Sequence, residues 1–259
     1  MSTSNATLLS LISRLLDYPE ATLFENREAV VAMVAESTVE PALRARLEIF
    51  LSEYLARNVM DCQAEYDGLF ERGRSLGLWL FEHVHGESRD RGQAMVDLMA
   101  KYTEAGLEIS QRELPDYIPL FLEFLATQGD ENARSWLIDV EHILALLQVR
   151  LERRESGYSI LLETLLSYAG STISLDDVRK NVAGEKRDDN KKALDKEWEE
   201  EEVTFGADSL DKSCEKSKRR PSETQRKDLD VPLHWVGFDE GQASGTNATT
   251  TSSSRGAAK

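Results

Sequence analysis

Residues 7–19 read TLLSLISRLLDYP, and this stretch decides the fold class. Its apolar residues recur at the three-and-four spacing that places side chains on one face of an α-helix: Leu8, Leu11, Ile12, Leu15 and Leu16. Pro19 follows them, and a helix does not continue through proline without a kink or a break. The stretch therefore predicts an amphipathic helix that buries one face and stops before Pro19.

The same spacing continues to about Gly184. Pro41 stands where a proline of a first helical turn belongs, ahead of a long apolar series. We expect Asp61 and Ser88 to cap two later helices, and Gly106 to end the second of them. Further apolar faces follow in residues 118–125, 137–147 and 158–165. Because alternating, β-branched patterns are nearly absent, the sequence predicts an all-α protein, a single bundle of about eight to ten helices with short connections.

The composition changes after Gly184. Residues 185–205 include the charged run ALDKEWEEEEV at 193–203, which predicts a short charged helical extension. Residues 206–259 are polar and end in GQASGTNATTTSSSRGAAK, a low-complexity segment that cannot bury a core. We therefore expect three parts: a helical domain at 1–184, this extension, and a mostly disordered, flexible C-terminal tail.

The chain carries an excess of acidic residues, 47 Asp and Glu against 31 Lys and Arg, for a formal net charge of −16. This excess repels nucleic-acid phosphates and anionic lipids, so neither nucleic acid nor a membrane is an expected partner. No apolar run approaches the roughly 18 residues that a membrane helix needs. No Lys or Arg precedes the first apolar stretch, as a secretory signal would require. The only cysteines, Cys62 and Cys214, fit a reducing compartment, and we expect a cytoplasmic protein.

The common catalytic motifs are missing from the sequence. It has no Gly-rich phosphate loop, no Gly-x-Gly-x-x-Gly, no Gly-x-Ser-x-Gly and no His-Glu-x-x-His. The four histidines are His83, His85, His142 and His234, and only the first two are neighbours. We therefore predict that the chain is not an enzyme and has neither catalytic residues nor a metal site.

The densest polar segment is residues 81–92, FEHVHGESRDRG, with two histidines, three carboxylates and two arginines in twelve residues. His83 and His85 with a carboxylate could hold a metal ion, and His85 could form an acid–base pair with Glu82 or Glu87, although both signals are weak. A helix–loop–helix junction whose charges cap helix ends and pair with one another explains the same residues. We favour a polar recognition surface for a peptide, because binding residues concentrate on loops that rigid helices hold.

A second segment, residues 112–122, reads RELPDYIPLFL. Pro115 and Asp116 predict the start of a helix whose apolar residues are buried. A functional interpretation adds Asp116 and Tyr117 to the mouth of a groove beside the first segment. The predicted partner-binding residues are therefore His83, His85, Glu87, Asp90, Arg91, Asp116 and Tyr117.

Two smaller expectations concern charged side chains. Unperturbed imidazoles titrate near pH 6.5, so we expect His83 and His85 to make partner binding pH-dependent. Neighbouring carboxylates would raise their pKa values and burial would lower them, and the sequence leaves both possibilities open. Arg153, Arg154 and Glu155 should form a solvated helix face.

Residues 80–98, LFEHVHGESRDRGQAMVDL, strongly resemble the nitrate reductase delta-subunit family, the molybdenum-cofactor assembly chaperones. The likeness covers about residues 8–205. Shorter segments support it: SRLLDYP at 13–19, YDGLFERGR at 66–74, RELPD at 112–116 and ALDKEWEEE at 193–201. Tyr117 departs from the family pattern, which usually has histidine after Pro-Asp, so a role for an imidazole there does not carry over.

This resemblance implies a helical, cytoplasmic chaperone that is not part of the mature enzyme. Family members bind the N-terminal segment of the apo alpha (catalytic) subunit in its complex with the beta subunit. They delay membrane attachment until the molybdenum guanine dinucleotide cofactor is inserted. We expect this chain to assist that insertion without binding the cofactor stably. Two other classes remain open: a permanent structural helical subunit and, less favoured, a metal-dependent enzyme that uses His83 and His85.

Overall fold

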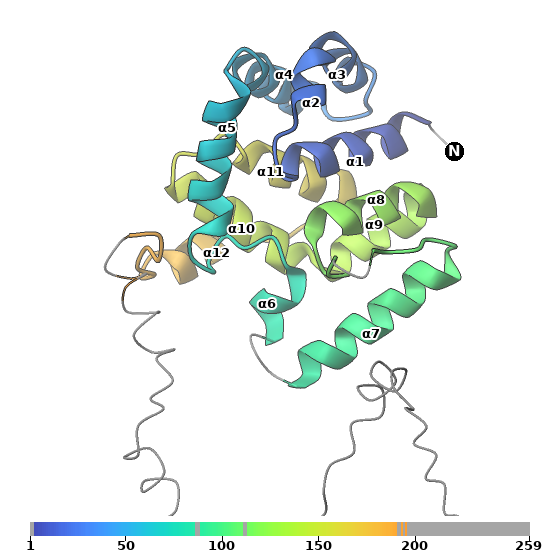
Figure 1. Ribbon diagram of the computed structural model, residues 1–259, viewed down its shortest axis with the longest axis vertical. Coiled ribbons are helices and arrows are strands. Elements are labelled where there is room, and N and C mark those ends of the chain that lie inside the picture. The colour runs from blue at the N-terminus through green and yellow to red at the C-terminus, as the bar shows by residue number, and fades with distance from the viewer. Residues whose placement is uncertain (1–2, 86–88, 111–112, 191–192, 194, 196–259) are drawn as a thin grey trace, which may run out of the picture. The chain divides into compact units, whose positions relative to one another are not determined.

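The structure is a computed structural model that describes residues 3–85, 89–110, 113–190, 193 and 195. These residues form twelve α-helices, one π-helix and no strand, which confirms the all-α prediction (Figure 1). None of the helices in this part of the chain is long and apolar enough to cross a membrane. The predicted flexible tail and most of the predicted charged helix lie outside the described residues.

The α-helices are α1 (Thr3–Leu16), α2 (Ala21–Glu25), α3 (Arg27–Ala35), α4 (Pro41–Leu55), α5 (Val59–Tyr66), α6 (Leu80–His85), α7 (Arg89–Glu104), α8 (Ile118–Gln128), α9 (Asp130–Asp139), α10 (Glu141–Arg153), α11 (Ser159–Ala169) and α12 (Leu175–Val182). The π-helix η1 (Asp67–Glu71) continues directly from α5.

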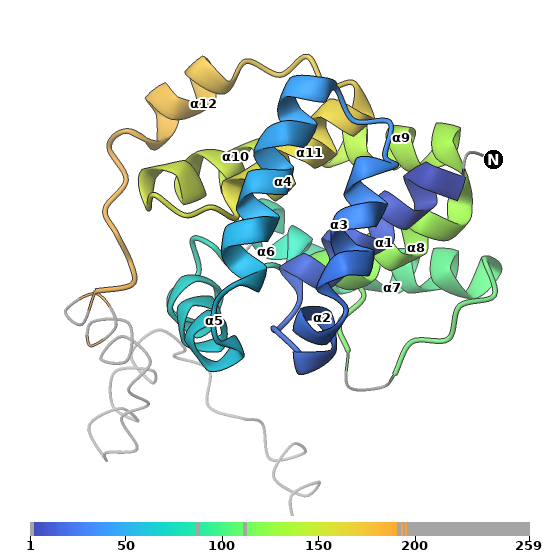
Figure 2. The same cartoon turned by 90° about the horizontal axis from the view of Figure 1, so that it is seen from above.

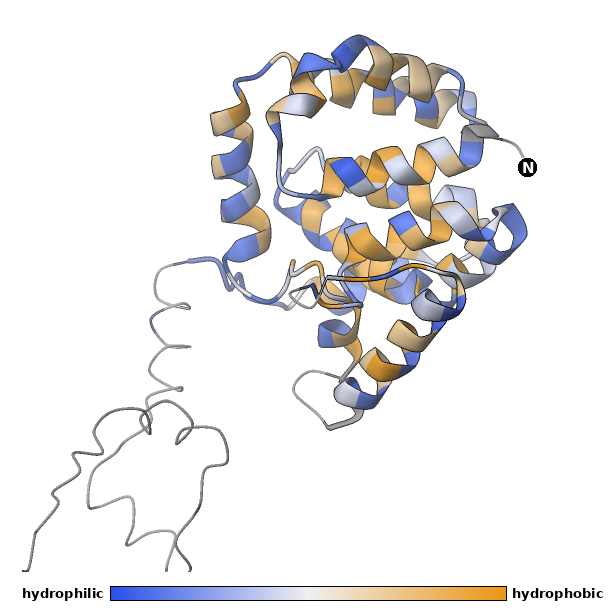
Figure 3. Ribbon diagram, turned by 45° about the vertical axis from the view of Figure 1, so that its right-hand side comes forward, coloured by the Kyte–Doolittle hydropathy of each residue, from blue (hydrophilic) through white to orange (hydrophobic). Residues whose placement is uncertain are grey.

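Helix α1 lies in the middle of the bundle, between α3 on one side and α8 on the other, and also packs on α11 (Figure 2). The predicted apolar face of α1 is buried, with Leu8, Ile12 and Leu16 fully inaccessible to solvent. Each such leucine contributes about 1.5–3 kcal/mol by leaving water. The hydroxyl of Ser13 donates to the carbonyl of Pro119 at 2.7 Å, which fixes α1 on α8. Apolar residues gather where the helices face one another (Figure 3).

A buried aromatic cluster joins α4 and η1 to Tyr158, the residue directly before α11. The ring of Tyr158 lies 5.7 Å from Tyr54 and 5.2 Å from Phe70, both edge-on. The hydroxyl of Tyr158 donates to that of Tyr54 at 3.1 Å, which satisfies a polar group inside the core. Phe70 in turn packs on Tyr66 at 4.8 Å, which connects this cluster to the end of α1.

Several helix boundaries differ from the sequence-based expectations. Helix α5 begins earlier than predicted, because the side chain of Asn58, not Asp61, accepts the N–H of Met60 and caps it. The apolar residues Leu23, Val30 and Val34 suggest one helix between Pro19 and Pro41, but this segment is divided at Asn26 into α2 and α3, which is one reason why there are more helices than expected. Gly106 ends α7 as predicted, with φ of +77° and its N–H bonded to Thr103. The predicted cap Ser88 lies outside the described residues.

Residues 185–189, called the strap below, follow α12 and lie against the end of α10. Arg150 binds Glu185 through two hydrogen bonds of 2.8 and 2.9 Å, and Arg154 lies 2.7 Å from Asp188. The side chain of Arg154 is only 6% exposed. The expectation of a solvated face at Arg154 was therefore wrong, because acidic residues from a later segment cover this guanidinium.

Candidate functional site

Asp116 lies at the point where α6, α7 and α8 meet. Trp79 and Tyr117 form a short antiparallel bridge there: the N–H of Leu80 donates to the carbonyl of Asp116 at 2.9 Å, and the N–H of Ile118 donates to the carbonyl of Leu78 at 2.8 Å. The carboxylate accepts the N–H of Phe81 at 3.2 Å, in the first turn of α6. Asp116 therefore stabilises a helix 35 residues earlier in the chain.

The prediction that Asp116 starts its own helix was wrong. Helix α8 begins at Ile118, with Pro119 in its first turn, so Asp116 precedes it. Asp116 is also fully buried, so it does not belong to an exposed contact surface in this structure. Burial raises the pKa of its carboxyl above the ordinary value, although the N–H of Phe81 and the charge of Arg91 act in the opposite direction.

Arg91, on α7, is another predicted site residue that lies beside Asp116. Its guanidinium lies 3.7 Å from the Asp116 carboxylate, and its side chain is 22% exposed. Arg91 Nε and Asp116 Oδ1 are both buried and have no hydrogen-bond partner among the described residues. The structure thus brings these two predicted residues together as a loose ion pair that links α7 to the start of α8.

His83 is turned toward the protein. Its Nε2 lies 2.7 Å from the carbonyl oxygen of Gly77. Burial lowers the pKa of His83, although the hydrogen bond to Gly77 opposes that effect. Of the two opposing effects that the sequence left open for this imidazole, burial is thus the larger. Among the residues described, no three His, Cys, Asp or Glu side chains come close enough to hold a metal ion.

The remaining predicted residues are placed only in part. His85 and Asp90 lie in α6 and α7, but their side chains are not described, and Glu87 lies outside the described residues. A shared contact surface of His83, His85, Glu87 and Asp90 therefore stays a prediction.

Tyr117 points away from this junction, toward the end of α1. Its hydroxyl donates to Asp17 Oδ1 at 3.0 Å and lies 3.0 Å from the hydroxyl of Tyr66. Tyr66 in turn donates to the carbonyl of Leu16 at 3.2 Å. Burial is the largest of the effects that raise the pKa values of both phenols, so both stay protonated. A side-chain hydrogen bond therefore joins Asp17 to Tyr117, 100 residues later in the chain.

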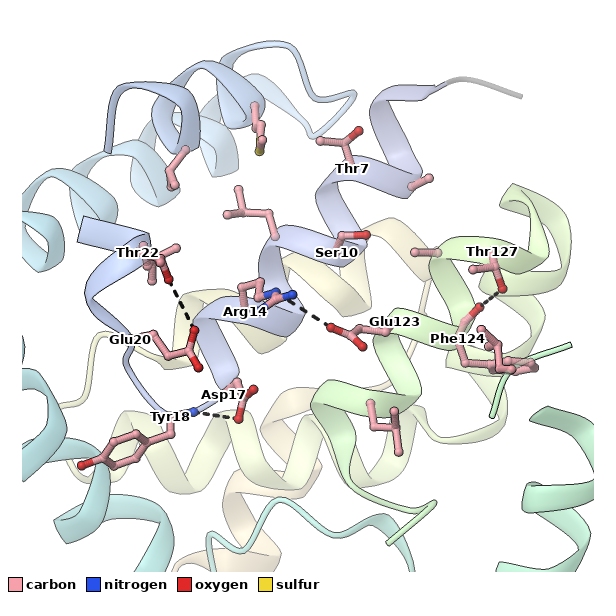
Figure 4. Close-up of a pocket in the computed structure, with 18 of the residues that line it drawn as sticks. Thr7, Ser10, Arg14, Asp17, Tyr18, Glu20, Thr22, Glu123, Phe124 and Thr127 are labelled. Atoms are coloured by element: carbon pink, nitrogen blue, oxygen red, sulfur yellow. Dashed lines mark hydrogen bonds and ion pairs between the residues drawn. The ribbon is translucent and has the colours of Figure 1, made fainter. Parts of the chain in front are cut away.

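Asp17 lies at one end of a groove of about 920 Å³. Helix α1 runs along the groove, α2 and α3 form one wall, and α8 with the segment after α7 forms the other (Figure 4). The apolar lining includes Leu11, Leu23, Val30, Met33, Leu107, Ile109, Leu120 and Phe124. We call this the α1 groove.

The charged lining of the α1 groove is mainly acidic. Four carboxylates line it, from Asp17, Glu20, Glu108 and Glu123, against the one guanidinium of Arg14. Arg14 Nε lies 3.9 Å from Glu123 Oε1, and both side chains are at least half exposed. An apolar lining with an acidic rim suits an amphipathic helix whose polar face is basic.

The sequence did not reveal this groove. Its apolar residues have the spacing of ordinary core positions, and Leu11 is in fact buried while it also lines the groove. One available signal was Leu107-Glu108-Ile109, where apolar and acidic residues alternate directly after the helix-ending Gly106. The groove itself depends on how far α2 and α3 stand from α8, which no local pattern encodes.

Comparisons with known proteins agree with the resemblance seen in the sequence. A model of the family described as nitrate reductase delta subunit matches residues 30–159. The nitrate reductase molybdenum cofactor assembly chaperone NarJ of Escherichia coli (strain K12) is 49% identical over 201 residues, which cover 77% of this chain and 85% of that protein. NarW of the same strain, named as a probable chaperone of the same kind, is 45% identical over 210 residues, which cover 81% and 88%.

Proposed function

The chain belongs to the nitrate reductase delta subunit family, and from this premise we propose that it is an assembly chaperone for a respiratory nitrate reductase and not an enzyme. It binds the N-terminal segment of the apo alpha subunit within the alpha–beta complex, in the cytoplasm. It thereby keeps this complex from attaching to the membrane until the molybdenum cofactor is in place, and it then leaves. Two relatives named as chaperones of this kind support the proposal.

The α1 groove is the observation that carries the proposal. A bound helix would place its apolar side chains against Leu107, Leu120 and Phe124 and its polar side chains beside the acidic rim. Burying four side chains of the client would release about 6–12 kcal/mol, from which the ordering of a free segment subtracts several kcal/mol. Such a balance gives a moderate affinity, which suits a chaperone that must release its client.

The cofactor belongs to the client in this proposal. The chaperone needs only to hold the alpha subunit in a state that accepts the molybdenum guanine dinucleotide, without binding that group stably itself. We propose a supporting role for the seven residues predicted from sequence. Asp116, Arg91 and Tyr117 fix the ends of α6, α7 and α1, while His83, His85, Glu87 and Asp90 extend the client contact beyond the groove.

A titration with matched variants tests the groove. The purified full chain is titrated by calorimetry with a synthetic peptide of the alpha-subunit N-terminal segment. Leu107→Asp should weaken binding about tenfold or more, because it puts a charge against the apolar face of the helix. Ile49→Asp is the control, since Ile49 is 58% exposed and does not line the groove.

Equal losses in both variants, with unchanged melting temperatures, would contradict the groove as the client site. No binding of the peptide by the wild-type chain would contradict the proposed function. A chain that stays bound to the mature, membrane-attached enzyme would instead support the rival class, a permanent structural subunit.

A further inference from the structure

We propose that Asp17 is the acceptor for a positively charged nitrogen of the client and that Tyr117 holds it in place, so that the α1 groove binds its client in one direction. This inference rests on the proposed function and adds a specificity-determining residue to it. Asp17 is an acidic side chain at the C-terminal end of a helix, where a negative charge is unfavourable.

Asp17 directly follows the last residue of α1, with its N–H bonded to the carbonyl of Ser13. The C-terminus of a helix carries a partial negative charge, so a carboxylate there is disfavoured by about 0.3–1 kcal/mol. A basic or neutral residue would serve the helix better. The carboxylate is therefore better explained by something it binds than by the stability of α1.

The hydrogen bonds of Asp17 leave one oxygen open. Oδ1 accepts both internal bonds, from the N–H of Tyr18 at 2.8 Å and from the hydroxyl of Tyr117 at 3.0 Å. Oδ2 accepts none from the described residues. Both donors are neutral, so they orient the carboxylate without neutralising its charge. The open oxygen is suited to a charge-assisted bond from an ammonium or a guanidinium.

The orientation of Asp17 is set by a small hydrogen-bond network. The single hydroxyl hydrogen of Tyr117 goes to Asp17, and that of Tyr66 is left for the carbonyl of Leu16 or the oxygen of Tyr117. Tyr66 is buried, and the ring of Tyr18 packs edge-on against it at 5.6 Å. Tyr117 is therefore a positioning residue, held from α5 and directed at the end of α1.

The charges along the groove are distributed unevenly. Figure 4 shows Asp17, Tyr18 and Glu20 at one end, and Thr7 and Thr127 at the other. Arg14, the one cation in the lining, is directed across to Glu123 and does not pair with Asp17.

The end of the groove at Asp17 and Glu20 is thus acidic, and Thr7 and Thr127 lie at the opposite end, while Glu108 and Glu123 are the remaining carboxylates of the lining. A helical client also has a positive N-terminal end, which favours the same orientation. The cationic nitrogen could belong to the amino terminus of the client or to a Lys or Arg side chain within it.

A double-mutant cycle with the full chain and peptides of the client N-terminal segment tests the assignment. Asp17→Asn keeps the shape of the side chain and the oxygen that accepts the Tyr117 hydroxyl, but it removes the charge. It should therefore lower the affinity for the unmodified peptide about five- to tenfold. One series of peptides is acetylated at the amino terminus, and another has single Lys or Arg residues changed to Gln. Against the peptide that lacks the partner cation, Asp17→Asn should cause no further loss.

Tyr117→Phe tests the positioning role, because it removes one hydroxyl and no charge. It should lower the affinity about two- to fivefold, and only for those peptides that keep the partner cation. Asp176→Asn is the control, since Asp176 is 80% exposed on α12 and does not line the groove. Melting temperatures of all variants are measured in parallel.

The assignment would be overturned if Asp17→Asn lowered the affinity equally for every peptide, or for none of them. The proposed function would still stand in either case. If the wild-type chain binds the unmodified peptide and Tyr117→Phe changes only the melting temperature, Tyr117 merely stabilises the end of α1. Absence of peptide binding by the wild-type chain would overturn the proposed function and this assignment with it.

Discussion

Replacing Asp188 with asparagine should destabilise the protein by about 2 kcal/mol. Asp188 is the centre of the strap: its carboxylate accepts the N–H and the hydroxyl of Ser75 and one N–H of Arg154, each at 2.7 Å. Gly73 leaves room for it, because a Cβ there would lie 2.6 Å from the carboxylate. The strap therefore depends on these polar contacts rather than on apolar packing.

The expected loss of stability follows from how deeply Asp188 and Arg154 are buried. Breaking a buried ion pair costs about 3–5 kcal/mol, because it leaves one charge without a counter-charge. Here the cost is smaller, since Asp188 is 28% exposed and Arg154 keeps a second partner, Asp189, at 2.9 Å. The amide oxygen of the new asparagine also keeps one of the bonds to Ser75.

The loss of stability caused by Asp188→Asn should also depend on pH. Burial acts to raise the pKa of Asp188, but the hydrogen bonds of Ser75 and the charge of Arg154 outweigh it, so the pKa lies below its ordinary value. A carboxyl with a depressed pKa in the folded state contributes its full stability above the unfolded value of about 3.9 and loses it as the pH falls through the folded value. The difference between the variant and the wild type should stay constant from about pH 8 to 5 and shrink below about pH 4.

Urea unfolding of the full chain, followed by circular dichroism, measures this difference. Asp176→Asn is the control, because that carboxylate forms an exposed pair with Arg179 and its loss should cost less than about 0.5 kcal/mol. If Asp188→Asn and Asp176→Asn have the same small effect, the strap does not unfold together with the bundle. The reasoning about Arg154 as a buried charge would then be refuted.

Three further predictions use the same unfolding assay. Glu155 has a φ of +54°, so Glu155→Gly should raise stability by about 0.5–1 kcal/mol; no gain would mean that this backbone is unstrained. Burial depresses the pKa of His83, so wild-type stability should fall as the pH drops below about 6.5, and His83→Gln should remove that part of the dependence; an unchanged profile would contradict it. Truncation after Asp208 should leave the free energy of unfolding unchanged, whereas truncation after Gly184 should lower it through loss of the strap; a longer product that is unfolded would refute the proposed boundary.

Features set by nearby residues could be predicted from the sequence. The spacing of Leu8, Leu11 and Leu15 and the position of Pro19 were enough for α1, because helix faces and proline stops are local properties. The cap of α5 was missed because Asn58 and Asp61 are both good capping residues, and propensity does not choose between them. Element type was therefore predicted better than element boundaries.

Features set by distant segments could not be predicted. Asp116 has the sequence context of a helix cap, and it does support a helix, but one that lies earlier in the chain. Arg154 looked solvated because the strap that covers it comes 34 residues later. The α1 groove needs the relative placement of three helices. In each case the local pattern gives the chemistry of a side chain, and only the packing gives its partner.

The identity of residue 117 bears on the pH dependence of the site. The tyrosine at this position donates its hydroxyl hydrogen to Asp17. A histidine donor would gain a positive charge near pH 6.5 and would then compete with the client for the same carboxylate. Burial moves the pKa of Tyr117 still higher than that of an ordinary phenol, so its hydroxyl stays neutral at every physiological pH. The hydrogen bond from Tyr117 to Asp17 is therefore not lost or altered by titration of Tyr117. Any pH dependence of client binding has to come from groups other than residue 117.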